Sequence, residues 1–373
     1  MVSDVNISFD QMTVCDGVGW FVDINFNVLF KMDLETEKIE MVCELPIYNH
    51  HRYQYRRMIA VKKLLIIIPY NADKILIYDV TQNKIKEVAL DSSYSANGML
   101  LNFADAFVCG EYVYFIPARY RAIVKMHSKH HSLEYFEDCI REIVMEKPFN
   151  NNRHIFSGTY VLEDKIAYLP LWQRGAYLKV NIENMSFDII NVDKDIIGFQ
   201  GMCKQEGNYV FSEKDKMSFW ITDKNGVVLK QYFINENKSG ISSGVSRFIE
   251  NDNGYWMIPA KGENICIIDK EFKMLQTIYN KKLEYLNNSK KYAYGDLSFG
   301  ECCLYGGNVF IYSWYDGVCL KIDLSTQKIH KISMKYKMND LLKQQLQAFG
   351  KHYCNVIVRE DVFFDLSTFI NSI

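Results

Sequence analysis

Seven short apolar segments recur along the chain, and each ends in a polar residue. Five end in Asp, one in Asn and one in His. An Asp or Asn side chain can accept a hydrogen bond from the backbone two residues further on, so these ends predict turns. Successive ends are 46, 48, 54, 42, 46 and 54 residues apart. The segments are 29–33 (LFKMD), 75–79 (ILIYD), 123–127 (IVKMH), 177–181 (YLKVN), 219–223 (FWITD), 265–269 (ICIID) and 319–323 (CLKID).

A second apolar run precedes each segment, and in four cases it closes with proline, at Pro69, Pro117, Pro170 and Pro259. Proline cannot donate to a strand ladder, so it marks the end of a strand. A turn signal and a further strand come before this run. Each unit is therefore predicted to hold four short strands, which we call A to D in chain order.

Four strands in every 42 to 54 residues is the spacing typical of a β-propeller blade. We predict an all-β chain whose residues 1–373 form a single β-propeller of four-stranded blades. Seven blades are favoured, six or eight remain open, and the repeat units span about residues 12–333. Residues 334–373 are predicted as a C-terminal extension with a short helix after Asn339, because Leu342, Leu346 and Phe349 then share one face. A sandwich pair or a solenoid explains the recurring four-strand pattern less well.

Three units continue alike after the segment end, with Asp33-Leu-Glu-Thr-Glu-Lys-Ile, Asp79-Val-Thr-Gln-Asn-Lys-Ile and Asp323-Leu-Ser-Thr-Gln-Lys-Ile. The D-x-x-T-x-K turn and the strand-B proline resemble kelch-like and NHL-like β-propellers, and the chain is similar to uncharacterised bacterial propellers of this kind. The resemblance covers most of the chain. It implies a fold, and propellers serve too many purposes for the fold to imply a function.

Charge and composition narrow the classes of partner. The chain carries 43 basic and 45 acidic residues, which leaves no basic excess for general nucleic-acid binding. The start lacks the charged and apolar regions of a leader, and the longest apolar run, 64–68, is too short to span a bilayer. The ten cysteines lie mostly among apolar neighbours and form no C-x-x-C motif. We therefore expect a cytoplasmic protein without a membrane partner.

Candidate ligand-binding residues lie in the strand B to C turns and in the links from strand D to the next blade. In propellers these segments usually share the face around the central channel. Short turns do not require Trp, Tyr or Arg, so their presence there indicates a ligand face. Aromatic rings can stack on a sugar, and guanidinium groups bind carboxylate or phosphate. The predicted contacts are Tyr70, Arg119, Tyr120, Trp172, Arg174, Trp314 and Tyr315 in turns, and Arg52, Arg56 and Arg153 in links. The alternative is that these aromatic side chains pack between blades and the arginines lie over them.

Catalytic and metal signatures are weak. His50, His51, His154 and Asp73 are the only candidates for acid-base work at the channel, and no established catalytic motif is present. The histidines in 127–131 lie in a C to D turn and are predicted to be solvated, so we expect no metal and no cofactor. The sequence thus favours a non-catalytic module that binds a polar or anionic, saccharide-like ligand, or a protein or peptide partner. The alternative is a propeller lyase or hydrolase acting on a saccharide or lactone.

Overall fold

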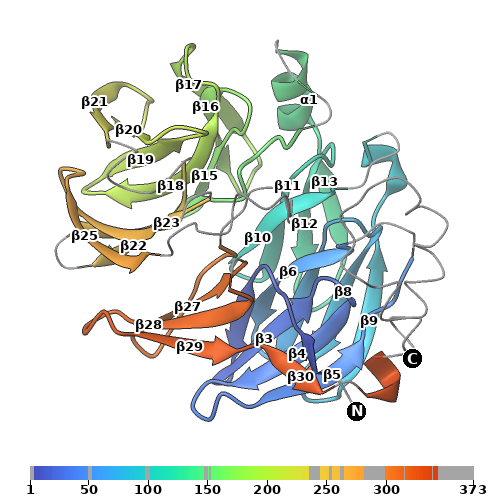
Figure 1. The fold of residues 1–373 in the computed structure, drawn as a ribbon. Helices are drawn as coiled ribbons and strands as arrows, with labels where there is room; N and C mark the ends of the chain where they lie inside the picture. Colours follow the sequence, from blue (N-terminus) through green and yellow to red (C-terminus); the bar gives the residue numbers. More distant parts are fainter. Residues whose placement is uncertain are drawn as a thin grey trace, which may run out of the picture.

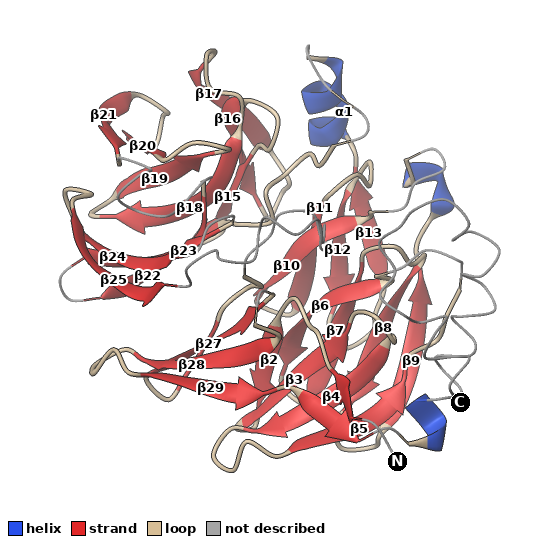
Figure 2. Ribbon diagram, in the orientation of Figure 1, coloured by secondary structure: helices blue, strands red, loops and turns tan. Residues whose placement is uncertain are grey.

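The chain forms a seven-bladed β-propeller in which every blade is a four-stranded antiparallel sheet (Figure 1). The computed structural model describes residues 4–48, 53–96, 101–146, 150, 153–234, 244–251, 254–260, 264–280, 299–314, 316–337 and 339–342. Within these residues the strands far outnumber the helices (Figure 2). The predicted fold class and the favoured blade number are confirmed.

The strands follow one another around each blade in chain order. The A strands are β2 (Met12–Cys15), β6 (Tyr55–Val61), β10 (Phe103–Cys109), β14 (Val161–Glu163), β18 (Phe199–Gln205), β22 (Val245–Asn251) and β26 (Cys303–Tyr305). The B strands are β3 (Val18–Asp23), β7 (Leu64–Pro69), β11 (Tyr112–Pro117), β15 (Ile166–Pro170), β19 (Asn208–Glu213), β23 (Gly254–Pro259) and β27 (Asn308–Ser313). The C strands are β4 (Val28–Asp33), β8 (Lys74–Asp79), β12 (Ile123–His127), β16 (Gly175–Asn181), β20 (Ser218–Thr222), β24 (Asn264–Asp269) and β28 (Val318–Asp323). The D strands are β5 (Ile39–Glu44), β9 (Lys84–Ala89), β13 (Leu133–Phe136), β17 (Phe187–Asp193), β21 (Val228–Phe233), β25 (Met274–Asn280) and β29 (Ile329–Ser333).

The recurring Asp closes strand C for the predicted reason. Oδ1 of Asp33 accepts hydrogen bonds from the backbone N–H groups of Glu35 (3.0 Å) and Thr36 (2.7 Å). Asp79 and Asp323 make the same pair of bonds in their own blades. Each side chain thus builds the turn from strand C to strand D.

Apolar side chains form a separate core between each pair of neighbouring blades. Among the described residues there are seven such clusters, one for each blade interface around the ring. The cluster between the last and first blades contains Phe9, whose ring lies 4.5 Å from that of Phe21 and 4.9 Å from that of Tyr312. In Figure 1 the orange strands of the last blade accordingly lie beside the blue first blade. The apolar contacts therefore run continuously around the propeller.

A separate strand pair closes the ring, and each of the seven blades consists of strands that are consecutive in the chain. Strand β1 (Asp4–Asn6) pairs with β30 (Lys335–Lys337) in a two-stranded antiparallel sheet. Next to it, the N–H of Ile7 donates to the carbonyl of Met334 at 2.8 Å. The two flanks of the repeat region are thereby joined outside the seven blades.

Helices are minor additions. Helix α1 (Asp138–Met145) lies in the link between the third and fourth blades and buries Cys139, Ile140 and Ile143 against them. This helix was not among the elements predicted from the sequence. Strand β9 is followed by a single 3₁₀ turn (Ser92–Tyr94). The predicted C-terminal helix begins as expected, because Oδ1 of Asn339 accepts from the N–H of Leu342 at 2.8 Å; Leu346 and Phe349 lie outside the described residues.

Two further observations concern the environment of the protein. In the described part of the chain, no helix has both the length and the apolar character needed to cross a membrane. None of the nine cysteines in that part forms a disulfide bond. The cytoplasmic location remains a prediction.

Candidate functional site

Three A strands begin with a bulge that is followed by a charged residue, and these charged side chains reach the central channel. In β6, Tyr55 pairs with Pro69 but Arg57 pairs with Ile68, so Arg56 is an extra residue in the ladder. The same shift precedes Asp105 in β10 and Arg247 in β22. A bulge interrupts the two-residue alternation and re-aims the side chain that follows it. The bulged starts therefore place charged groups of different blades at one level.

These groups form an ionic layer, which we define as Asp10, Arg56, Arg57, Asp105, Arg247 and Glu301. Arg57 is its centre, because it donates to Oδ2 of Asp10 (2.9 Å), Oδ2 of Asp105 (3.0 Å) and Oε1 of Glu301 (2.8 Å). Arg247 donates to Oδ2 of Asp105 at 3.0 Å and also to Glu301. Arg56 lies 3.2 Å from Oδ1 of Asp10. Three cations and three carboxylates, all largely buried, thus bridge blades across the channel.

The protonation of the layer follows from burial and from these contacts. Burial opposes the charge on Asp10, but Arg56 and Arg57 lower its pKa below the usual value. Burial raises the pKa of Asp105, and the nearby arginines offset only part of that increase. Burial also opposes the charge on Arg57, and the three carboxylates nevertheless hold its pKa well above the usual value. The arginine therefore stays charged and the layer stays paired.

The layer separates two cavities. The cavity on the side of the B to C turns, called the upper cavity, has a volume of about 380 Å³ and is lined by Asp10, Arg57, Thr159, Ser246 and Glu301 among others. The cavity on the other side, called the lower chamber, measures about 490 Å³ and is lined by Gln11, Met58, Tyr160, Arg247 and Cys302 among others. In each of five blades, the residue named for the upper cavity is followed directly in the chain by the residue named for the lower chamber, as Asp10 is by Gln11. The boundary lies at the ionic layer.

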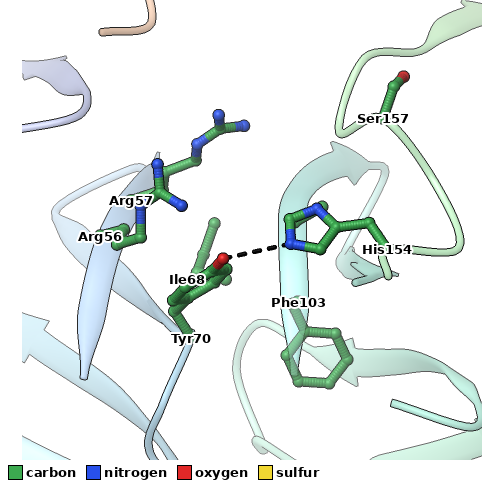
Figure 3. A pocket seen from close by; sticks show the side chains of 8 residues that line it. Arg56, Arg57, Ile68, Tyr70, Phe103, His154 and Ser157 are labelled. Atoms are coloured by element: carbon green, nitrogen blue, oxygen red, sulfur yellow. Dashed lines mark hydrogen bonds between the residues drawn. The ribbon is translucent and has the colours of Figure 1, made fainter. Parts of the chain in front are cut away.

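Two aromatic side chains with a cation over each ring flank the upper cavity. The guanidinium carbon of Arg56 lies 4.6 Å from the ring centre of Tyr70, and Nζ of Lys214 lies 4.7 Å from the ring centre of Trp172. His154 lies between them, with its ring centre 6.0 Å from each aromatic ring. Figure 3 shows the arginine side of this arrangement, with Arg56 approaching from one side of Tyr70 and His154 from the other.

The pKa of His154 reflects the charges around the upper cavity. Its Nε2 and the hydroxyl of Tyr70 are 3.2 Å apart and share a hydrogen bond (Figure 3). Burial is the main reason that its pKa falls to about 3, and the cations Arg56, Arg119, Arg57 and Lys214 lower it further. The imidazole is therefore neutral at pH 7, and positive potential prevails around it.

The structure brings four of the predicted residues together in the upper cavity, namely Arg56, Tyr70, His154 and Trp172. Arg119 is close enough to lower the pKa of His154, although it does not line the cavity. The other predicted residues in the described part lie elsewhere.

Packing and pairing explain the positions of those other residues. Tyr120 is fully buried between the second and third blades, and its hydroxyl donates to the carbonyl of Asp91 at 2.6 Å. Arg174 pairs with Glu146, next to α1. Trp314 packs against the cluster between the last and first blades, with its ring edge-on to Tyr312 at 4.9 Å. Tyr120 and Trp314 thus contact the cores between blades, and Arg174 makes an ion pair.

Two more candidates are solvent-exposed. Asp73 lies in the second blade's B to C turn, and Arg153 lies in the link before the fourth blade. Neither lines the upper cavity. His50, His51, Arg52 and Tyr315 lie outside the described residues.

No metal-binding group of three His, Cys, Asp or Glu side chains occurs in the described part of the structure. The histidines of the third blade take part in a turn, where Nδ1 of His127 accepts hydrogen bonds from the N–H groups of Lys129 (3.0 Å) and His130 (3.3 Å). This is the turn that the sequence predicted.

Apart from Arg56, the residues of the ionic layer were not among the predicted candidates, and neither was Lys214. A signal for the layer exists: in three blades an aromatic residue lies two positions before a charged one, at the start of strand A in Tyr55-Arg56-Arg57 and Phe103-Ala104-Asp105 and just before it in Phe299-Gly300-Glu301. Aligning the repeats on this pattern would have found charged residues at one position of several blades. Lys214 had no comparable signal, because its contact with Trp172 joins two different blades.

Comparison with known proteins identifies the fold. No protein-family model matches the sequence, and no curated protein matches it. Among solved structures, a catalytically inactive virginiamycin B lyase from Staphylococcus aureus with quinupristin is similar, with 13% identity, a TM-score of 0.61 and coverage of 89% of this chain and 99% of that one. Dihydro-heme d1 dehydrogenase NirN in complex with DHE has 10% identity, a TM-score of 0.55 and coverage of 90% and 69%. The computationally designed Ika8 protein has 9% identity, a TM-score of 0.56 and coverage of 89% and 90%.

These similarities concern the backbone only. Two enzymes of different reaction types and one designed protein share this architecture, so the likeness carries no activity to the present chain. The kelch-like and NHL-like repeat type remains a prediction. What the comparisons support is that this chain is similar in fold to seven-bladed β-propellers.

Proposed function

We propose that the upper cavity binds an anionic small molecule with a saccharide-like ring. The observation that carries this proposal is the arrangement around His154, where two aromatic rings, each with a cation over it, flank a concave cavity. An aromatic face can pack against the apolar face of a sugar ring, and ammonium and guanidinium groups bind carboxylate or phosphate. The low pKa of His154 supports a negative ligand, because the same positive potential that disfavours its protonation attracts an anion.

The shape of the site favours a small molecule over a protein partner. A volume of about 380 Å³ lies within the range of small-ligand cavities, roughly 300 to 1,000 Å³. A protein-docking surface would be expected as a flatter and more apolar patch. The polar lining by Asn71, Gln200 and Ser246 suits hydroxyl groups.

Binding is favoured over catalysis by the chemistry of the candidates. A histidine with a pKa of about 3 is a weak base near neutral pH, so His154 is poorly suited to remove a proton. Asp73 is solvent-exposed and does not line the cavity. The resemblance to a lyase concerns the fold, and it therefore adds no weight to the enzymatic alternative.

A thermal-shift panel with glucose 6-phosphate, glucuronate and glucose tests the proposal. The two anionic probes are expected to raise Tm and glucose to raise it less; saturation at a hundredfold above Kd corresponds to about 2.7 kcal/mol. The variant Trp172→Ala/Lys214→Met should lose the shift. A matched control is Lys125→Met, since Nζ of Lys125 lies 4.3 Å from the ring centre of Tyr112, away from the cavity.

Two results would contradict the proposal. One is the absence of a Tm increase with either anionic probe. The other is an increase that survives in Trp172→Ala/Lys214→Met to the same extent as in Lys125→Met.

A further inference from the structure

The lower chamber is built by the A-strand segments of all seven blades. Its lining includes Thr13 from the first blade, Met58 from the second, Tyr160 from the fourth and Met202 from the fifth. Its volume of about 490 Å³ exceeds that of the upper cavity and also lies in the range of small-ligand sites, roughly 300 to 1,000 Å³. The ionic layer forms the boundary between the two.

Several polar atoms on this lining have no hydrogen-bond partner within the described residues. They are Oγ1 of Thr13, the hydroxyl of Tyr160, Nε2 of Gln11 and Nη1 of Arg247; Oε1 of Gln11 accepts from the N–H of Met58 at 3.3 Å. These four residues are only partly buried, so their polar atoms are accessible from the chamber. These atoms can therefore donate to or accept from a molecule in the chamber.

The charges at the chamber boundary are already paired. Oδ2 of Asp105 accepts from Arg57 and Arg247, and Oδ1 of Asp105 accepts from the N–H of Ala106 at 2.8 Å. Arg247 is matched by Asp105 and Glu301. A charged ligand would have to give up its hydration without gaining an opposite charge, which is unfavourable.

Apolar groups supply the remaining lining. Phe248 contributes an aromatic ring, and Met58 and Met202 contribute flexible thioethers on other blades. A ligand with hydroxyl groups at its edge and an apolar ring face matches this mixture of donors, acceptors and apolar surface.

We propose that the lower chamber is a second ligand site, which takes an uncharged, hydroxyl-rich ring such as a cyclitol or a pyranose. It is distinct from the site in the upper cavity, since the two cavities share none of their lining residues. The proposal does not rest on ligand binding in the upper cavity.

Methionine-methyl NMR tests this site directly, because Met58 and Met202 line the lower chamber and no methionine lines the upper cavity in the described part of the chain. The probe is myo-inositol, titrated into protein labelled with [methyl-¹³C]methionine, with Met58→Leu and Met202→Leu used for assignment. The methyl signals of Met58 and Met202 are expected to shift with saturation. In Thr13→Val/Tyr160→Phe, which removes two hydroxyl groups and little volume, the affinity should fall at least about tenfold.

The control variant Trp172→Ala/Lys214→Met alters the upper cavity and should leave the titration unchanged. Matching methionine spectra without the probe establish that each variant is folded. The proposal is overturned if the two signals do not move up to the solubility limit of myo-inositol, or if their shift persists in Thr13→Val/Tyr160→Phe. A titration that disappears in Trp172→Ala/Lys214→Met would place the probe in the upper cavity and overturn it as well.

Discussion

The upper cavity and the lower chamber lie on the same channel and are both lined by A-strand segments, but the upper cavity also takes side chains from turns and links. The upper cavity takes Tyr70 and Trp172 from B to C turns and His154 from a link, whereas the lower chamber is lined by A-strand segments. Loops accept changes in length and composition more readily than strands, whose side chains must alternate between fixed faces. In this protein the turns and links add aromatic rings and His154 to the upper cavity, whereas the lower chamber has only the side chains that the A-strand segments supply.

The ionic layer makes the comparison possible, because it keeps two chemically different spaces apart. Arg57 of the second blade contacts carboxylates from the first, third and seventh blades. Arg247 of the sixth blade pairs with two of the same carboxylates. A layer of paired charges is rigid only while every partner is present. The largest predicted effect therefore concerns this layer.

Replacing Arg57 with methionine should destabilise the protein by about 3 to 5 kcal/mol, since it leaves Asp10, Asp105 and Glu301 buried with too few cations. Urea unfolding measures the change. Adding Asp105→Asn should recover part of the loss, and the double-mutant cycle gives the coupling. Arg141→Met is the control, because among the described residues this exposed arginine pairs only with Glu137, at the N-cap of α1, and Asp138, the first residue of α1.

The control should change the free energy of unfolding by no more than about 0.5 kcal/mol. If Arg57→Met were as mild as Arg141→Met, the ionic layer would not divide the channel as a rigid element. The two cavities would then have to be treated as one space.

The second prediction concerns pH and the upper cavity. The pKa of His154 is about 3 in the folded protein and about 6.5 in an unfolded chain, so the unfolded state binds the proton more readily between these values. The contribution of neutral His154 to stability is complete above pH 6.5 and is lost as the pH falls toward 3. The loss approaches about 1.4 kcal/mol per pH unit, less the screening by solvent at this half-buried site.

The variant His154→Gln isolates this contribution, because the difference in unfolding free energy between the two proteins should change only over that pH range. NMR titration of the imidazole adds a sharper measurement. Inorganic phosphate, as an anion in the upper cavity, should raise the pKa of His154 toward its usual value, and myo-inositol in the lower chamber should not. A pKa near 6.5 without any anion would contradict the proposed positive potential.

The smallest predicted effect distinguishes Tyr70, which lines the upper cavity, from Tyr120, which is buried between two blades. Tyr120→Phe removes the hydrogen bond to the carbonyl of Asp91 and should lower stability by about 1 kcal/mol without changing the thermal shift caused by glucose 6-phosphate. Tyr70→Phe removes the hydroxyl beside His154 and should weaken that thermal shift while changing stability less. The opposite pattern would exchange the roles assigned to these two residues.

The repeating elements could be predicted because their causes are local. The Asp at the end of strand C forms its own turn, as Asp33 does, and the proline at the end of strand B stops the ladder, as Pro69 does. Helix α1 was not predicted, because its three buried apolar residues gain their stability from the blades on either side.

The candidate site was predicted only in part. Tyr70 and Trp172 carry the signal of an aromatic residue in a short turn, but so does Tyr120, which the structure places in the core. Turn position says which face of the propeller a residue is near, and it does not say whether the side chain points into the channel or between blades. That direction depends on the packing of the neighbouring blade.

The sequence by itself determined the seven four-stranded units and the turns between their strands, since hydrogen bonds within a few residues and the apolar pattern of each strand decide them. Only the tertiary structure decided that Asp10, Arg57, Asp105, Arg247 and Glu301 form one layer and that this layer separates two cavities. The physical reason is that these residues are up to 291 positions apart in the chain. Bulges and closure of the ring bring them to one level, where their charges offset one another.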